Sequence, residues 1–291
     1  MTLRGWNHAI NLAPSSGKSP QLSSLSAPTA CHLDRDKLDM LETRSVSRHF
    51  GGVAAVDAIS LKVAAGEIAG LIGPNGAGKT TLFNLLAGRL KPSGGEIWFS
   101  GRRIDDQPDH ARIALGLGRT FQIPRLFAQM SLIENLLTAA KDQTGERILP
   151  NWLAGAGVRA QERRNLERAM ALLAFVTLDK LARQPARVLS GGQRKLLELA
   201  RVLMAEPKLI LLDEPAAGVN PTLLETIIDR IRAINAQGIT FLIIEHNMDL
   251  VARLCSRALV MVEGHLLCEG APAEVTRDPR VIEAYLGGAV A

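Results

Sequence analysis

A glycine-rich stretch, Gly73-Pro-Asn-Gly-Ala-Gly-Lys-Thr80, is the pattern in this sequence with the clearest chemistry. It fits G-x-x-x-x-G-K-[ST] and lies between an apolar run over residues 68–72 and a helical pattern over residues 81–90. Strand, glycine loop and helix are the context that a phosphate-binding P-loop requires. The glycines let successive amides point into one cavity, and the helix adds unpaired amides and its positive dipole end. The stretch therefore predicts a polyphosphate site.

The side chains of this loop predict how a nucleotide is held. Lys79 is expected to reach the terminal phosphates as a point charge, and the Thr80 hydroxyl to hold a Mg2+ ion that bridges them. The residues predicted to bind the nucleotide here are Gly73, Pro74, Asn75, Gly76, Ala77, Gly78, Lys79, Thr80 and Thr81.

Two adjacent carboxylates, Asp213 and Glu214, follow the continuously apolar stretch over residues 209–212. Ligands of parallel sheets bind at the carboxyl ends of such strands. Because consecutive strand residues point in opposite directions, the two carboxylates are expected to have different roles. Asp213 is predicted to hold Mg2+ through its water shell. Glu214 is predicted to take a proton from the water that attacks the γ-phosphate.

A second glycine-lined helix start is predicted at Leu-Ser-Gly-Gly-Gln193. Ser190 is placed to cap the helix that follows, with Gln193 at the capping-box position. Gly191 and Gly192 cost stability in a helix, up to about 1 kcal/mol each against alanine. The presence of glycine at both positions is explained if an anion must approach the backbone closely. Two such helix ends serve one nucleotide only if they face each other across it, within one chain or between two.

Three single side chains are further candidates. His246 follows an apolar strand pattern over residues 241–245, where it is placed to hydrogen-bond the γ-phosphate or to order the attacking water. Gln122 is placed to turn a neutral oxygen toward the metal. Phe50 lies 23 residues before Gly73, where stacking on an adenine ring and closing a small strand layer are equally compatible with the sequence.

The periodicity of apolar residues predicts the strands and helices that position these side chains. Short strands with glycine turns are expected from residue 41 to residue 99, apart from the P-loop helix. A helical insert is expected over residues 123–187. It begins with the capping-box pattern of Ser131 and Glu134 and has a surface loop over residues 144–158. Its second helix, over residues 159–176, is expected to carry Leu166, Met170 and Leu173 on one face.

After residue 189, helices and strands alternate along the chain. Strands are expected over residues 209–212 and 239–244, and helices up to residue 204 and over residues 221–236. This alternation predicts an α/β fold with a parallel sheet that is covered on both faces.

Residues 1–39 differ from the rest of the chain, because they are rich in serine and proline and contain no acidic residue before Asp34. This composition predicts a disordered extension. Met40 directly precedes a credible first strand, so we favour a mis-assigned start, with translation beginning at Met40. The globular domain is expected over residues 40–288.

The composition of the 291 residues narrows the class of protein. No apolar run approaches the roughly 18–20 residues of a membrane span, so a role at a membrane would require a partner. The net charge of +5 comes without a dense basic block, and nucleic-acid binding is not expected. Cys31, Cys255 and Cys268 lack the spacing of a disulfide framework or a zinc site, which fits a reducing cytoplasm.

Taken in order, the P-loop, Gln122, Leu-Ser-Gly-Gly-Gln193, Leu-Leu-Asp-Glu-Pro215 and His246 resemble the ATP-binding cassette of ABC transporters. The resemblance covers residues 40–288. It implies a P-loop NTPase core with a parallel sheet, a small antiparallel β layer and an inserted α-helical subdomain. It also implies ATP and Mg2+ as ligands, and ATP hydrolysis coupled to transmembrane transport.

The same resemblance implies roles for the site residues. ATP would lie between the P-loop of one subunit and the Ser190–Gln193 motif of the other in a head-to-tail dimer, so the second helix end would act on the partner's nucleotide. Phe50 would stack on the adenine and Gln122 would sense Mg2+ and the membrane partner. Glu214 would be the general base and His246 the switch histidine. The residues that would contact the opposite ATP are Ser190, Gly191, Gly192 and Gln193.

Finer details are similar to the ATPase subunits of branched-chain amino acid importers, among them Arg119-Thr-Phe-Gln122 and the ending over residues 281–287. Asn220 stands where the wider family usually has Asp, although this importer group commonly has Asn. The resemblance implies a peripheral subunit on the cytoplasmic face of the inner membrane. Its partners would be two transmembrane permease subunits, a second identical or related ABC ATPase and, indirectly, a periplasmic solute-binding protein.

Three other functions share much of this pattern. Import of urea or another amide and export of lipopolysaccharide would use a similar ATPase with a different permease. A soluble cassette ATPase of translation or DNA repair is less expected, because such proteins usually carry two cassettes or a long coiled coil. The identity of the solute is left open by the sequence.

Overall fold

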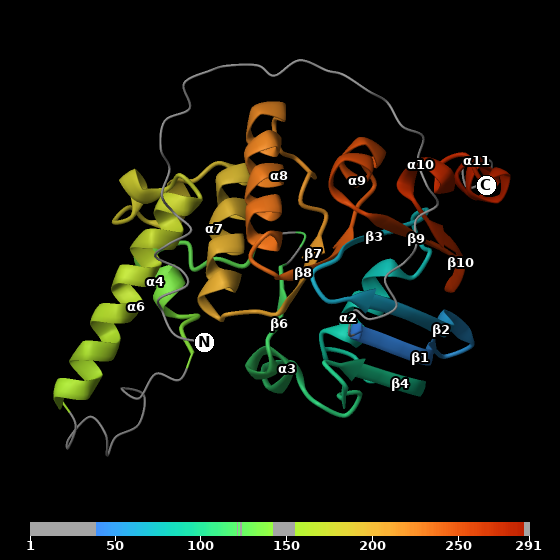
Figure 1. Cartoon of the computed structure of the whole chain (residues 1–291), viewed down its shortest axis with the longest axis horizontal. Coiled ribbons are helices and arrows are strands. Elements are labelled where there is room, and N and C mark those ends of the chain that lie inside the picture. The colour runs from blue at the N-terminus through green and yellow to red at the C-terminus, as the bar shows by residue number, and fades with distance from the viewer. Residues whose placement is uncertain (1–38, 121, 123, 142–154, 288–291) are drawn as a thin grey trace, which may run out of the picture. The chain divides into compact units, whose positions relative to one another are not determined.

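The computed structural model describes residues 39–120, 122, 124–141 and 155–287 (Figure 1). Residues 1–38 of the extension predicted over residues 1–39, and most of the predicted loop over residues 144–158, lie outside the described residues. The loop prediction is wrong for Gly155 to Val158, because these residues form the start of helix α6. Asp39, assigned to the extension, already belongs to strand β1.

A four-stranded antiparallel sheet forms the predicted small β layer, with the strand order β2-β1-β4-β5. Strand β1 pairs along most of its length with β2 and, on its other edge, with β4. The strands are β1 (Asp39–Phe50), β2 (Val53–Ala64), β4 (Gly94–Phe99) and β5 (Arg102–Arg103).

The second sheet has six strands in the order β10-β9-β3-β8-β7-β6. All neighbouring pairs are parallel except β10 and β9, which are antiparallel at one edge. This confirms the predicted parallel sheet. The strands are β3 (Ile68–Ile72), β6 (Leu117–Arg119), β7 (Leu209–Asp213), β8 (Thr240–Ile244), β9 (Arg257–Val262) and β10 (His265–Gly270).

Helices cover both faces of this sheet. In Figure 1, α8 and α9 lie on one face, and α2 lies on the other together with the antiparallel strands. The helices are α2 (Lys79–Leu86), α3 (Asp109–Leu115), α4 (Leu132–Leu137), α6 (Gly155–Phe175), α7 (Gly191–Met204), α8 (Pro221–Asn235), α9 (Met248–Leu254), α10 (Pro272–Val275) and α11 (Pro279–Gly287).

The main core lies between the two sheets and is centred on α2. Leu82, Phe83 and Leu86 are fully buried there against alternate residues of the parallel strands, such as Leu71 and Leu211. This alternation is what a pleated sheet requires, because successive side chains point to opposite faces. The packing fixes α2, and therefore the loop that precedes it, against the sheet.

Helix α2 ends at Leu86, four residues earlier than predicted. The guanidinium of Arg112, which is almost fully buried, donates hydrogen bonds to the carbonyl oxygens of Leu85 and Leu86 at 2.7 and 2.8 Å. These carbonyls belong to the last turn of the helix, where no intrahelical donor is available. A side chain distant in sequence therefore completes the end of α2.

The predicted apolar face of α6 is correct for Leu173, which is buried, and wrong for Leu166 and Met170, which are exposed. Ala169 and Leu172 are buried beside Leu173. These buried residues recur at helical spacing on a neighbouring face, which packs against α4 and α7. The periodicity was compatible with both faces, and only the positions of the neighbouring helices select one.

Candidate functional site

The P-loop joins β3 to α2 and is closely packed against the chain around it. A Cβ atom at Gly73 would lie 2.1 Å from the carbonyl oxygen of Met261, and one at Gly78 would lie 2.2 Å from that of Ala55. Gly78 is the N-cap of α2, has φ +93° and provides no side-chain cap. The first turn of α2 also contains no acidic residue. The amides of this helix start are therefore left for an anion, as the sequence predicts.

Lys79 is folded back into this loop. Its Nζ donates hydrogen bonds to the carbonyl oxygens of Gly73 and Pro74, at 2.7 and 2.8 Å, and the residue is 6% exposed. Burial lowers the pKa of Lys79, and the carboxylates of Glu214 and Asp213 oppose that shift. A desolvated ammonium inside a glycine loop is placed to gain strongly from a phosphate.

Asp213, the last residue of β7, is paired with a buried arginine. Its Oδ2 lies 3.3 Å from Nη2 of Arg119 on β6, and Nη1 of that arginine donates to Oδ1 of Asn84 on α2 at 2.7 Å. Burial raises the pKa of Asp213, while Arg119 acts in the opposite direction. The arginine thus ties the carboxylate at the end of β7 to the helix that follows the P-loop.

Glu214 lies at the centre of the predicted catalytic group. Its Oε1 is 3.0 Å from Nε2 of His246, and its Oε2 accepts a hydrogen bond of 2.7 Å from Nε2 of Gln122. The three residues follow β7, β8 and β6, so the carboxyl ends of three parallel strands bring them together. In this arrangement the Gln122 amide contacts the Glu214 carboxylate, whereas the sequence predicted that Gln122 contacts the metal.

Glu245 was missed as a site residue. It is buried, and its carboxylate accepts hydrogen bonds from the backbone amides of Ala216 at 2.7 Å, His246 at 3.0 Å and Asn247 at 3.2 Å. It therefore joins the turn after β7 to the turn after β8, and it fixes the position of the His246 backbone. The signal in the sequence was an acidic residue at the end of an apolar strand, directly before that histidine.

The helix start at Ser190 is built differently from the P-loop helix. The Ser190 hydroxyl accepts from the amide of Gln193, and Gln193 Oε1 accepts from the amide of Ser190, so the predicted capping box is present. A Cβ at Gly191 would make only one ordinary van der Waals contact, at 3.9 Å from the carbonyl oxygen of Gly218. One at Gly192 would lie 2.2 Å from Cδ2 of Leu223. The interpretation that both glycines admit an anion therefore needs correction, because the buried Gly192 packs against α8.

Phe50 ends β1 and is 46% exposed. The guanidinium of Arg48 lies 4.8 Å from the centroid of its ring. An exposed aromatic ring at the end of a strand remains compatible with both predicted roles. In the P-loop, Asn75, Gly76 and Thr80 are exposed and Thr81 is partly buried.

Comparison with known proteins decides the family. Residues 56–217 match the family described as ABC transporter, and residues 265–291 match the branched-chain amino acid ATP-binding cassette transporter family. The chain belongs to the ATP-binding cassette family. It is therefore an ATP-binding, ATP-hydrolysing cassette of the kind that drives transport, as the order of its motifs predicts.

Curated relatives extend over most of this cassette. It is 39% identical to the probable branched-chain amino acid transport ATP-binding protein LivG of Archaeoglobus fulgidus, over 86% of this chain and 96% of the relative. It is also 39% identical to the high-affinity branched-chain amino acid transport ATP-binding protein BraF of Pseudomonas aeruginosa, over 86% of this chain and 98% of the relative.

Solved structures support the same fold. A crystal structure of an ATP-binding cassette of an ABC transporter in its ADP conformation is 37% identical, with a TM-score of 0.75, and the match covers 86% of this chain and 99% of that one. The predicted P-loop NTPase fold class is thus confirmed. Within the described ranges, no helix of the cassette combines the length and apolar character needed to cross a bilayer.

A groove of about 520 Å3 lies beside strand β6. Its walls come from α3, β6, the end of α4 and α7. It is lined by apolar residues such as Ile113 and Val202 and by charged residues such as Asp109, Arg119 and Arg201. Arg119, which lines this groove, lies three positions before Gln122 in the sequence, and the Gln122 amide donates to the carboxylate of Glu214.

Proposed function

We propose that this cassette is the ATP-hydrolysing subunit of an importer that takes up branched-chain amino acids. The observation that carries the proposal is the match of its C-terminal residues 265–291 to the branched-chain family, which covers β10, α10 and α11 outside the general cassette match. The names printed for the relatives over their almost full length support it. ATP binding closes a dimer, and hydrolysis reopens it.

The P-loop residues bind the triphosphate. The amides of the loop and of the first turn of α2 donate to phosphate oxygens, and the ammonium of Lys79 exchanges its carbonyl partners for the terminal phosphates. Hydroxyl, carboxylate and amide oxygens are the hard ligands that Mg2+ prefers, and the side chains of Thr80, Asp213 and Gln122 provide them. When bound, Mg2+ neutralises charge that develops on the phosphates.

Glu214 acts as the general base. Its carboxylate takes a proton from the water that attacks the γ-phosphate, and His246 and Gln122 each contact one of its two oxygens. Asp213 faces Arg119 and does not share this position, which agrees with different roles for the two carboxylates.

The Ser190–Gln193 segment acts on the ATP of a second cassette. Gly191 is exposed and no atom lies closer than 3.9 Å to the position of a Cβ, so a phosphate has space to approach this helix start. A dimeric cassette bound to ADP and phosphate has the same fold at 23% identity. The second cassette is identical or closely related.

The groove beside β6 receives the permease. Its mixed apolar and charged lining makes it suitable for a helical segment, and Arg119 in that lining lies three positions before Gln122, whose amide contacts Glu214. Two permease subunits would hold the dimer at the cytoplasmic face of the inner membrane, and a periplasmic binding protein would deliver the solute.

Solute-stimulated hydrolysis tests this function. The chain is reconstituted in liposomes with the permeases, the binding protein and any second cassette from its own locus, and phosphate release is measured with leucine, isoleucine, valine or urea. We expect stimulation by the branched-chain amino acids. Stimulation by urea alone, or indifference to every solute, would overturn the assignment.

Glu214→Gln tests the general base. We expect ATP hydrolysis to fall by about 10^2- to 10^4-fold, because general-base catalysis is lost. ATP affinity should be retained, and ATP should hold the variant as a dimer. Phosphate release and size-exclusion chromatography with ATP measure both effects. Normal hydrolysis by this variant would show that Glu214 is not the general base.

A further inference from the structure

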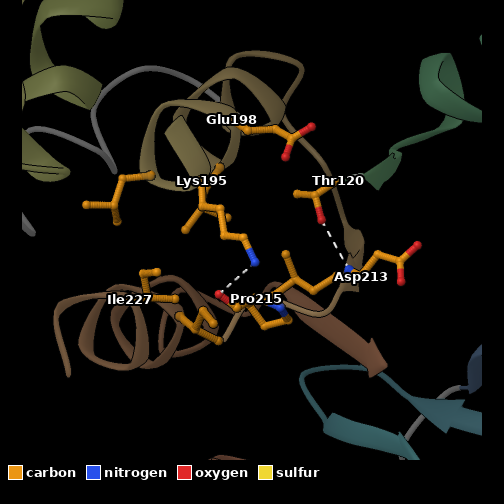
Figure 2. A pocket seen from close by; sticks show the side chains of 10 residues that line it. Thr120, Lys195, Glu198, Asp213, Pro215 and Ile227 are labelled. Carbon is orange, nitrogen blue, oxygen red and sulfur yellow. Dashed lines mark hydrogen bonds between the residues drawn. The ribbon is translucent and has the colours of Figure 1, made fainter. Parts of the chain in front are cut away.

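Lys195 connects helix α7 to the backbone of Glu214. It lies on the first turns of α7, two residues after Gln193, and its side chain runs toward the turn that follows β7 (Figure 2). Its Nζ donates hydrogen bonds to the carbonyl oxygens of Glu214, at 2.5 Å, and Pro215, at 3.3 Å. The Asp213 side chain points away from this ammonium, so the lysine contacts the backbone of the turn.

The backbone of Glu214 has a conformation that needs such support. Its φ is +47°, in the left-handed region, which residues other than glycine adopt mainly where their surroundings hold them there. Its amide donates to the carbonyl oxygen of Ile244 on β8 at 3.0 Å. Strand β8 therefore holds the peptide unit before Glu214. Lys195, together with the amide of Ala217 at 3.2 Å, holds the carbonyl oxygen of the peptide unit after it.

The environment makes the Lys195 interaction strong. The lysine is half-buried, and burial lowers its pKa while the carboxylates of Glu245 and Glu214 oppose that shift. A charged donor to a carbonyl in a partly desolvated setting forms a stronger hydrogen bond than a neutral donor does. The direction in which the Glu214 carboxylate points is thus sensitive to where α7 holds this ammonium.

We propose that Lys195 is a positioning residue for hydrolysis, which aligns the Glu214 carboxylate through its backbone and makes that alignment depend on the position of α7. The inference rests on the proposed role of Glu214 as general base. Helix α7 begins at the segment proposed to contact the partner's ATP. Engagement of that ATP would therefore be transmitted, through one rigid helix, to the base that acts on the subunit's own ATP.

Lys195→Met separates this role from simple packing. Methionine keeps the unbranched stem and removes the donor, and a small cavity of about 20 Å3 beside Lys195 leaves room for it. We expect kcat for ATP to fall about 10- to 100-fold, because a small misplacement of a catalytic group has effects of this size. The KM for ATP should change by less than about twofold, because the P-loop is intact.

Two further variants serve as controls. Lys195→Arg keeps charged donors within reach and should recover most of the lost kcat. Lys208→Met makes the same substitution at an exposed lysine on the loop before β7, and should leave kcat and the unfolding temperature unchanged. If Lys195→Met proves poorly folded by thermal unfolding, Lys195→Gln replaces it, since its shorter amide cannot reach the Glu214 carbonyl from the same position.

A double-mutant cycle with Glu214→Gln decides whether Lys195 acts through Glu214. If it does, Lys195→Met should not reduce further the residual hydrolysis of Glu214→Gln, measured in single-turnover reactions of the full chain. Multiplicative losses, or a loss confined to KM, would overturn the inference. Normal hydrolysis by Glu214→Gln alone would instead overturn the proposed base, so the two failures are distinguishable.

Discussion

Helices α2 and α7 both begin in glycine-containing motifs, but the glycines are required for different reasons. At the start of α2, side chains on Gly73 and Gly78 would overlap the backbone carbonyl oxygens of Met261 and Ala55. At the start of α7, a side chain on Gly191 would make one ordinary contact, at 3.9 Å from the carbonyl oxygen of Gly218, and one on Gly192 would meet side-chain atoms of Leu223 and Val219 but no backbone. The first helix also lacks a side-chain cap, whereas the second is closed by its own capping box.

This difference separates what the single chain needs from what an assembly needs. The P-loop glycines are needed for the fold of the loop itself, because no side chain fits there. Nothing in the described part of the chain explains why residue 191 is glycine. We infer that the reason lies in what docks on this helix start, which agrees with its proposed contact to the partner's ATP.

Gly78→Ala should have the largest effect on stability. An L-residue in the left-handed region costs about 1–2 kcal/mol, and overlap with a backbone carbonyl adds about 1–3 kcal/mol, so we expect a loss of about 2–5 kcal/mol. ATP binding should be lost as well, because the loop must move. Urea unfolding and equilibrium binding of a fluorescent ATP analogue measure both effects.

Gly76→Ala is the matched control for that variant. Gly76 also has a positive φ, +81°, but its Cβ would meet no atom within 4 Å. Its loss of stability should therefore be limited to the left-handed cost of about 1–2 kcal/mol. Equal losses for the two variants would mean that overlap with Ala55 is unimportant.

Gly191→Ala should affect activity without affecting the fold. Alanine is a better helix residue than glycine, so the free energy of unfolding should be unchanged or increase by up to about 1 kcal/mol. ATP affinity of the isolated subunit should be unchanged. ATP hydrolysis and ATP-induced dimerisation should both fall, by about tenfold or more, because the added methyl group obstructs the close approach of a phosphate. Activity equal to the natural chain would contradict the proposed dimer contact.

Gly192→Ala should have only a small effect on stability and is the mildest of these changes for function. The methyl group displaces the end of a flexible, partly exposed leucine, and the cost is offset by improved helix propensity, so we expect a change within about 1 kcal/mol. Differential scanning calorimetry with Leu223→Ala in the same background checks the cause, since truncating Leu223 should remove the penalty. A loss as large as that of Gly78→Ala would remove the contrast between the two helix starts.

Much of the cassette was predictable because its information is local. The P-loop, the capping boxes at Ser131 and Ser190, and the apolar strand before Asp213 are patterns within a few residues, and the structure has each of them. Their common position at the carboxyl ends of parallel strands follows from the alternation of strands and helices. The meeting of Gln122, Glu214 and His246 was therefore inferable before any contact was known.

The sequence by itself determined the family, the nucleotide loop and the identities of the acidic, amide and imidazole groups, because each depends on residue type and short spacing. Only the tertiary structure decided which other side chains contact and position these groups. Lys195 supports Glu214, Arg119 pairs with Asp213 and Glu245 joins two turns, through contacts between residues 19 to 94 positions apart. Helix packing likewise decided which face of α6 is buried and that Gly192 packs against α8. Contacts of this kind depend on strand order and helix packing, which no local pattern encodes.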